Sequence, residues 1–295
     1  MHGRGKEKRM PAAYAHFRMG QQVRHQLDGE SRRVIEQYPE LFQVGLHGPD
    51  ILFYDNPLVK NRVNRTGSGQ HERSGKAFFS DAAAVIRAHP GDNAYPAYCY
   101  GVLCHFGLDS ACHGYINQHV TDSGIEHNEI ETEFDRMLMV HDAHDPIRRH
   151  QTRHIERAIR RFDQIHLRNK GCAGTDETDP YEVISAFYPG ISARDIRKSM
   201  QGMVFYHELF RAPCPLKRAV LFSMMRLIGQ YDKLRGYFVN YQADPVCEES
   251  NEVLRPLYQE GKRRSEALIR SFDAAIFDED LSNPLYSYNF EGVVI

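Results

Sequence analysis

The sequence predicts an all-α protein, and two observations carry that prediction. Apolar residues recur at helical spacing in nine segments distributed over the 295 residues. Alternation of apolar and polar residues, which marks a half-buried strand, is scarce. The clearest strand-like pieces, residues 44–54 and 285–295, are short and contain or adjoin glycine and proline.

The nine predicted helices each repeat apolar residues three or four positions apart, which places those residues on one face. In chain order they span residues 13–27, 77–88, 95–116, 129–139, 147–165, 181–187, 193–209, 216–237 and 248–272. Pro180 and Ser192 stand where helix starts are expected, because proline suits the first turn and serine caps it.

The domain organisation follows from one polar, glycine-containing segment, residues 169–179, which we predict to be a linker. Before it, residues 10–168 form a helical region that contains most of the candidate metal ligands. After it, residues 180–295 form a second helical region, either part of the same domain or a separate helical extension. Residues 1–9 are predicted to be a flexible basic tail.

Composition narrows the classes of partner. The 37 basic and 39 acidic residues nearly cancel, so a nucleic-acid partner is not expected. The sequence has no apolar run long enough to span a bilayer and no secretory signal at its start. Its six cysteines form no CxxC pair, which favours a reducing compartment, and we expect a soluble, cytoplasmic protein. Cys104 and Cys112 are predicted to be buried as small apolar residues.

The most informative pattern lies between residues 105 and 131. His105, Asp109 and His113 are four residues apart, so on a helix they share one face. His127 and Glu131 repeat that spacing in the next predicted helix. Imidazole and carboxylate together are ligands that zinc and related divalent ions prefer. If the two helices face each other, these side chains would line a cleft that binds metal ions, and the pattern therefore predicts such a cleft.

Three further candidate ligands lie upstream. His16 follows Pro11-Ala12-Ala13-Tyr14-Ala15, Asp50 closes Leu46-His47-Gly48-Pro49-Asp50, and His71 follows a Gly/Ser-containing stretch. By pattern alone, Asp50 also suits a turn after Gly-Pro.

With these motifs in order, residues 10–140 resemble the zinc-dependent phospholipase C family, in its intracellular-type members without a membrane-binding β-sandwich. The resemblance implies a multi-helix bundle around a multinuclear metal site. Asp50, His71, His105 and Asp109 would hold one zinc ion, and His113, His127 and Glu131 a second. His16 and Asp109 would contribute to a third, with Asp109 bridging, so that two or three zinc ions are expected.

The resemblance also implies an activity. A metal-dependent phosphoester hydrolase is expected, most specifically one that cleaves a phosphodiester through a zinc-activated water, with phospholipid as a candidate substrate. Asp50 or that water would act as base or nucleophile, and Asp50 is the candidate catalytic residue. The alternatives are a zinc-dependent nuclease, a phosphomonoesterase and a non-catalytic metal-binding protein. The oligomeric state is left open.

The chain departs from the secreted members, which use an N-terminal tryptophan amine as a ligand, because it contains no tryptophan. A chain that starts at Met10 and loses it would offer the Pro11 amine instead.

The remaining polar residues are predicted to support the ligands or to lie in loops and on the surface. Asp135, one turn after Glu131, could orient a ligand, and His47 is predicted to be a loop residue. Glu129 and Glu133 are expected to face solvent or to support a ligand, and adjacent His207 and Glu208 point to different faces of their helix. A solvated surface is predicted for the cluster of His141, Asp142, His144, Asp145, His150 and His154.

Overall fold

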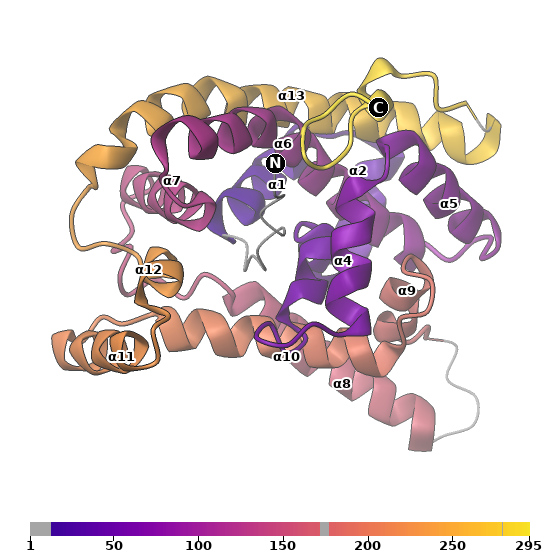
Figure 1. Ribbon diagram of the computed structural model, residues 1–295. Coiled ribbons are helices and arrows are strands. Elements are labelled where there is room, and N and C mark those ends of the chain that lie inside the picture. The colour runs from indigo at the N-terminus through magenta and orange to yellow at the C-terminus, as the bar shows by residue number, and fades with distance from the viewer. Residues whose placement is uncertain (1–12, 172–176, 279) are drawn as a thin grey trace.

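The computed structural model describes residues 13–171, 177–278 and 280–295 (Figure 1). The predicted basic tail at residues 1–9 and the Met10-Pro11 dipeptide lie outside these residues. Within the described ranges the chain is helical and forms no strand, with two isolated β-bridges, Ser74 to Asn289 and Tyr288 to Val294. The all-α prediction is confirmed.

The first part of the chain forms α1 (Tyr14–Gln26), α2 (Gly29–Gln37), α3 (Pro39–Gly45), the 3-10 helix η1 (Gly48–Tyr54), α4 (Arg62–Glu72), α5 (Gly75–Arg87), α6 (Ala94–Ser123), α7 (His127–His141) and α8 (Arg153–Gly171). The second part forms α9 (Pro180–Ala186), α10 (Ala193–Phe210), α11 (Pro215–Leu227), α12 (Tyr231–Leu234), η2 (Arg235–Tyr237), η3 (Pro245–Cys247), α13 (Glu248–Asp278) and η4 (Pro284–Ser287).

The predicted boundaries hold best for five helices. Helices α1, α5, α7, α9 and α10 begin and end within two residues of the prediction. Ser192 caps α10 and accepts a hydrogen bond from the Asp195 amide, as expected for a serine at a helix start. The predicted helix at 216–237 breaks after α11 because Gly229 adopts a positive φ of 66°, which ends the helix.

Other boundaries were predicted wrongly. The predicted helix at 147–165 starts only at Arg153, and α2, α3 and α4 were missed because they are short or polar. Neither strand-like piece is a strand: residues 44–54 end α3 and form η1, and residues 285–295 form most of η4 and an irregular segment. The predicted linker begins inside α8, and its residues 172–176 lie outside the described residues.

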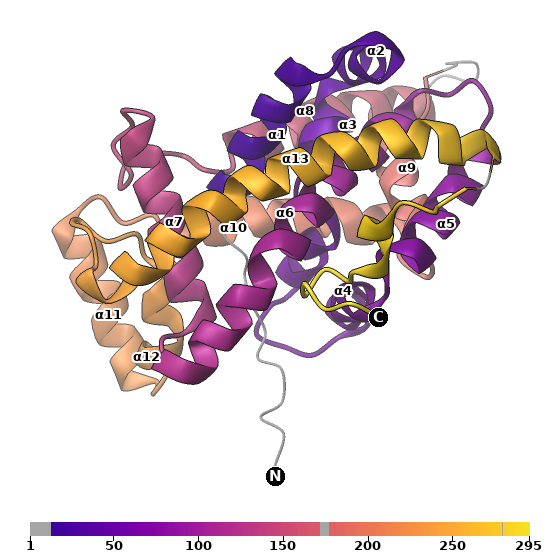
Figure 2. The same cartoon turned by 90° about the horizontal axis from the view of Figure 1, so that it is seen from above.

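Helix α6 is the centre of the fold, since residues 94–113 are buried on every face. Figure 2 shows α13 running alongside it. A β-carbon on Gly107 would lie 2.3 Å from the Ser265 hydroxyl of α13. On the other side, a β-carbon on Gly101 would lie 2.3 Å from the Phe42 carbonyl oxygen and 2.7 Å from Gly45 Cα of α3. Close backbone packing therefore fixes α6 between α3 and α13.

One hydrophobic core contains side chains from both predicted regions, among them Phe106 of α6 and Phe272 of α13. Cys104 and Cys112 are buried, as predicted. Helix α10 lies along the base of the molecule in Figure 1 and packs against η1. A β-carbon on Gly202 of α10 would lie 2.2 Å from the Tyr54 carbonyl oxygen, so this contact too depends on glycine. None of the described helices is both long and apolar enough to cross a membrane.

A buried pair of histidines corrects the prediction of a solvated surface at His154. His141 and His150 are exposed, but His154 is buried and stacks on Phe17 at a ring-centroid distance of 4.2 Å. Its Nε2 lies 2.6 Å from Nε2 of His47, which is buried as well. Burial lowers the pKa of His154 to about 3 and the pKa of His47 well below its ordinary value. Both rings are therefore neutral, and one Nε2 donates to the other.

We expect this pair to make the protein sensitive to acid. In the unfolded chain a histidine binds a proton below a pH of about 6.5, whereas folded His154 stays neutral down to about pH 3. The free energy of unfolding should therefore fall as the pH drops from 6.5 to 3, by about 1.4 kcal/mol per pH unit for each such histidine. In urea titrations between pH 6 and pH 4, His154→Gln should reduce the slope of the unfolding free energy against pH by about 1.4 kcal/mol per pH unit, which corresponds to one proton. His25→Gln, at an exposed position, should keep the wild-type slope; equal slopes for all three proteins would contradict the assignment.

Candidate metal centre

Four buried side chains from three elements form the first group of candidate ligands. Asp50 comes from η1, His71 from α4, and His105 and Asp109 from α6, with one ligand atom of each within 4.8 Å of the others. His71 Nε2 lies 2.8 Å from Asp50 Oδ1, and His105 Nε2 lies 3.1 Å from Asp109 Oδ2. Gly48 permits this approach, because a β-carbon there would lie 2.4 Å from His105 Cδ2. Its φ of +46° also suits glycine.

A second group joins α6 to the start of α7. His113, His127 and Glu131 again have ligand atoms within 4.8 Å of one another. The Oε1 atom of Glu131 lies 3.0 Å from His127 Nε2 and 3.3 Å from His113 Nε2. Gly124 ends α6 in the left-handed conformation, with φ of 73°, and lets the chain turn back into α7.

Asp109 links the two groups. Its Oδ2, which faces His105, also lies 3.8 Å from His113 Nδ1. Its Oδ1 lies 3.3 Å from Nε2 of His16, which α1 brings to the same place. The His16 and His105 rings lie 4.5 Å apart. The structure therefore brings together all eight residues that the sequence singled out.

Hydrogen bonds to backbone carbonyls orient two of the imidazoles. His71 Nδ1 donates to the Gly67 carbonyl oxygen at 2.7 Å, and His113 Nδ1 donates to the Phe290 carbonyl oxygen at 2.8 Å. Because each Nδ1 donates to a carbonyl, Nε2 is the nitrogen that could bind a metal ion once the ring is neutral, and it faces the carboxylate side of the centre. A second hydrogen bond of this kind commonly fixes a metal-binding histidine.

The charges in the centre favour a cation. Burial alone would raise the pKa of Asp109, but His105 and His113 outweigh it and hold that pKa below its ordinary value. Burial likewise opposes ionisation of Glu131, yet His127 and His113 lower its pKa well below the usual range. For His113, burial disfavours the charged ring, but Asp109 and Glu131 raise its pKa to about 10. These carboxylates are therefore ionised and attract positive charge to the imidazoles between them.

The donor set also fits zinc. Zinc binds nitrogen and oxygen ligands at about 2.0–2.2 Å, so two ligands of a tetrahedral ion lie roughly 3.3 Å apart. The nearest donor pairs here are separated by 2.8–3.3 Å. His105 Nε2 and Asp109 Oδ2 are buried and lie 3.1 Å from each other, but neither makes a hydrogen bond to any described residue. Buried polar atoms without a hydrogen bond are costly unless an ion or another partner satisfies them.

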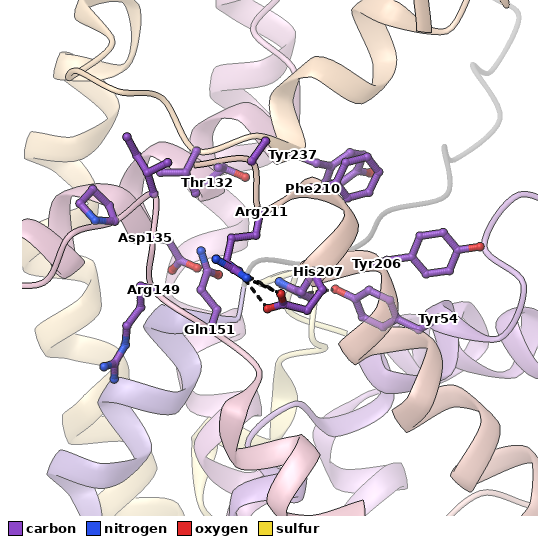
Figure 3. A pocket seen from close by; sticks show the side chains of 15 residues that line it. Tyr54, Thr132, Asp135, Arg149, Gln151, Tyr206, His207, Phe210, Arg211 and Tyr237 are labelled. Carbon is purple, nitrogen blue, oxygen red and sulfur yellow. Dashed lines mark hydrogen bonds and ion pairs between the residues drawn. The ribbon is translucent and has the colours of Figure 1, made fainter. Parts of the chain in front are cut away.

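Asp135 stands between the centre and a larger pocket. Its carboxylate accepts hydrogen bonds from the Tyr14 and Ala15 amides, at 2.8 and 2.7 Å, and burial raises its pKa to about 7. With His16 and Glu131 it lines a cleft beside the candidate ligands. It also lines the pocket in Figure 3, which has an empty volume of about 650 Å³ including its solvent-open part.

The walls of this larger pocket come from α10 and the residues after it, the segment around η2, α7 and the residues 146–151 that follow it. Tyr54 OH lies 2.9 Å from Nε2 of His207, and burial lowers the pKa of His207 to about 4, so that ring is neutral. Figure 3 shows Arg211 paired with Glu208, with a shortest nitrogen–oxygen distance of 2.7 Å. Arg149 contributes a guanidinium whose buried Nε has no hydrogen-bond partner among the described residues.

Sequence reasoning missed several residues around the centre. Phe290 lies in the segment with a strand-like pattern, and nothing in that pattern indicates contact with a metal centre. His207 was set aside because its neighbour Glu208 points elsewhere. Glu133 was expected to face solvent or support a ligand, but it is buried and pairs with Arg136 at 2.6 Å. Glu129 pairs with Arg235 at 3.0 Å.

A comparison with protein-family models places the candidate ligands in a known family. A family model described as zinc dependent phospholipase C matches residues 15–173, which is more than half of the chain. The matched range contains every candidate ligand from His16 to Glu131, whereas about half of the residues that line the larger pocket lie beyond it. Neither a curated protein nor a solved structure matched the chain.

Proposed function

We propose that this chain, which belongs to the zinc dependent phospholipase C family, hydrolyses a phosphodiester at the centre between α1, η1, α4, α6 and α7. The observation that carries the proposal is the pair of buried ligand groups joined through Asp109. A structural zinc site usually closes four ligands and favours cysteine, whereas mixed histidine and carboxylate ligands suit sites that keep a position for water. A catalytic role for the metal is therefore favoured over a structural one.

The assignment of ligands follows the two groups. Asp50, His71, His105 and Asp109 would hold one zinc ion, and His113, His127 and Glu131 a second. His16 and Asp109 would contribute to a third. Bound zinc lowers the pKa of water, neutralises phosphate charge and stabilises the leaving oxygen.

We assign the role of general base to Asp50. Its Oδ1 lies 2.8 Å from His71 Nε2 and pairs with it. Its Oδ2 lies 3.7 Å from His105 Nε2, which is beyond hydrogen-bonding distance. Oδ2 can therefore accept the proton of the attacking water. The fixed position of η1 against α10 and His105 keeps this oxygen beside the centre.

The larger pocket is proposed to bind the alcohol part of the substrate, since Asp135 connects it to the cleft beside the ligands. Its aromatic walls, including Tyr54 and Tyr237, offer apolar contact area, and Arg149 offers donors without a carboxylate partner among the described residues. These features suit an alcohol that carries a polar or anionic group.

Replacing Arg149 with glutamine is expected to weaken binding of such a substrate. A hydrogen bond from a charged donor contributes about 1.5–3 kcal/mol, so KM should rise about ten- to a hundred-fold while kcat changes little. The matched control is Arg148→Gln, because that neighbour is mostly exposed and pairs with Asp145 outside the pocket. Steady-state kinetics on a phosphodiester with an anionic alcohol group measures both constants; a fall in kcat at unchanged KM would contradict the binding role.

The function itself is tested with protein reconstituted with zinc. We expect it to bind at least two ions per chain and to hydrolyse a soluble chromogenic phosphodiester, with activity lost on chelation and restored by zinc. The same preparation is assayed with a chromogenic phosphomonoester, single-stranded DNA and phosphatidylcholine vesicles. Faster cleavage of the monoester or of DNA would replace the proposal with a phosphatase or a nuclease. Two bound ions without hydrolysis of any ester would leave a non-catalytic metal-binding protein.

A further inference from the structure

The chain ends in a folded turn whose tip lies against the metal centre. Within residues 287–295 the Asn289 amide donates to the Val293 carbonyl oxygen at 2.9 Å, so the segment doubles back on itself. Phe290, at the tip, is fully buried. Figure 2 shows the yellow C-terminal end beside α4. We call residues 287–295 the C-terminal turn; it lies outside the range that the family model matches.

The Phe290 ring packs against ligands of the first group. Its centroid lies 5.4 Å from that of His71 and 5.7 Å from that of His105. These two imidazoles stand nearly perpendicular to each other, at 87°, with centroids 6.2 Å apart. The Phe290 ring also packs against Phe106 and Phe78 of the core, at 4.9 and 5.6 Å. Because the core rings hold Phe290 in place, it limits how far the two imidazoles can turn.

The Phe290 backbone holds a ligand of the second group. Its carbonyl oxygen accepts the hydrogen bond from His113 Nδ1 at 2.8 Å. Nε2 of the same imidazole, the nitrogen left for a metal ion, lies 3.3 Å from Glu131 Oε1. One residue therefore contacts imidazoles of both ligand groups, which come from α4 and α6.

Close backbone contacts fix the C-terminal turn on both sides of Phe290. Before it, the Gly75 amide of α5 donates to the Tyr288 carbonyl oxygen at 2.7 Å. After it, Gly292 lies against α6, where a β-carbon would be 2.7 Å from the Gly114 nitrogen. The φ of Gly292 is positive, at 71°, which also favours glycine. The turn therefore has little freedom to shift relative to the ligands.

We propose that Phe290 is a positioning residue for the metal centre, and that its ring and its carbonyl oxygen raise the affinity of both ligand groups for zinc. Groups that orient a metal-binding histidine commonly contribute about ten- to a hundred-fold in metal affinity. A phenylalanine that only filled the core would contribute to stability and leave zinc affinity unchanged. The proposal rests on the ligand assignment of the proposed function and adds to the centre a part of the chain beyond the family range.

Zinc affinity of the full chain, measured by competition with a chromogenic chelator, tests the ring. Phe290→Leu keeps an apolar side chain and the backbone carbonyl but removes the ring from His71 and His105. We expect the zinc Kd of at least one ion to rise about ten-fold or more. The matched control is Phe272→Leu, since Phe272 is fully buried in the same core but its ring packs on Phe79. It should lose stability and still bind zinc as the wild type does.

A second variant tests the carbonyl oxygen without changing any ligand. Gly292→Ala should push the C-terminal turn away from α6, which lengthens the hydrogen bond from His113. The zinc Kd of at least one ion should again rise about ten-fold or more. Gly91→Ala is the matched control, because Gly91 also has a positive φ, of 82°, but nothing lies within 4 Å of an added carbon.

Nitrogen-15 NMR of the histidine side chains reports on this hydrogen bond directly. The His113 Nδ1 proton should exchange slowly with water in the wild type, because it is buried and bonded to the Phe290 carbonyl oxygen. It should exchange rapidly in Gly292→Ala. Circular dichroism checks that each variant is folded, and the wild-type NMR measurement decides on the hydrogen bond even where a variant is not.

Several outcomes would overturn the proposal. These are wild-type zinc affinity in both Phe290→Leu and Gly292→Ala, an equal loss of affinity in the two controls, or rapid exchange of the His113 ring proton in the folded wild type. Absence of zinc binding by the wild type would overturn this proposal and the proposed function together. A wild type that binds two zinc ions but cleaves no phosphodiester contradicts the proposed function alone, and the affinities still decide the role of Phe290.

Discussion

Replacing Asp109 with alanine should remove metal from both ligand groups and abolish hydrolysis. This carboxylate faces His16 through Oδ1 and both His105 and His113 through Oδ2. Without it the imidazoles lose the charge that draws a cation between them. We expect metal content to fall from at least two ions to fewer than one per chain. The rate should fall about a thousand-fold, which is the order of loss when a group that stabilises developing charge is removed.

Two variants sharpen this test. His127→Ala should release only the ion of the second group, because His127 belongs to that group alone; it should still abolish hydrolysis. Asp122→Ala is the matched control for Asp109→Ala. Asp122 lies on α6 as Asp109 does, but it is exposed and accepts a hydrogen bond from Gln118. Elemental analysis and rates on a soluble phosphodiester measure the effects. Two retained ions and a wild-type rate in Asp109→Ala would show that the ligands are assigned wrongly.

The second large effect concerns stability. Gly101→Ala places a methyl group 2.3 Å from the Phe42 carbonyl oxygen and 2.7 Å from Gly45 Cα, both of them backbone atoms of α3 that cannot rotate away. Overpacking of this kind costs about 1–3 kcal/mol or more. We expect the free energy of unfolding to fall by about 3 kcal/mol, although alanine by itself favours a helix. Because α6 provides three of the ligands, metal affinity should weaken too.

Gly69→Ala is the matched control for this prediction. It makes the same substitution inside a helix, but nothing lies within 4 Å of the added carbon. It should therefore stabilise the protein by roughly 0.5–1 kcal/mol, the gain in helix propensity. Urea unfolding measured by circular dichroism separates the two. If Gly101→Ala is as stable as Gly69→Ala, α3 and α6 are farther apart than the structure has them.

The sequence predicted the parts of the centre that lie within single helices. His105, Asp109 and His113 repeat every four residues, and His127 and Glu131 do the same, so periodicity alone places each set on one face. His16, Asp50 and His71 have no such partner nearby, and their support came mostly from the family resemblance. Periodicity describes one helix at a time and contains no information about which faces meet.

The features that were missed depend on contacts between distant segments. His47 and His154 are 107 residues apart, and nothing in either local sequence predicts that their rings meet. Tyr54 and His207 are separated by 153 residues, and a glycine on α10 brings them together. The helix break at Gly229 was missed because an isolated glycine is also tolerated inside a helix.

The hydrogen bond from His113 to the Phe290 carbonyl oxygen spans 177 residues of chain. A ribosome makes the chain from its amino end, so α6 and α7 leave the exit tunnel long before residue 290 is synthesised. During that interval His113 lacks the carbonyl acceptor that fixes its ring. We therefore expect the second ligand group to become fully ordered only after residue 290 has been synthesised and has packed against α6.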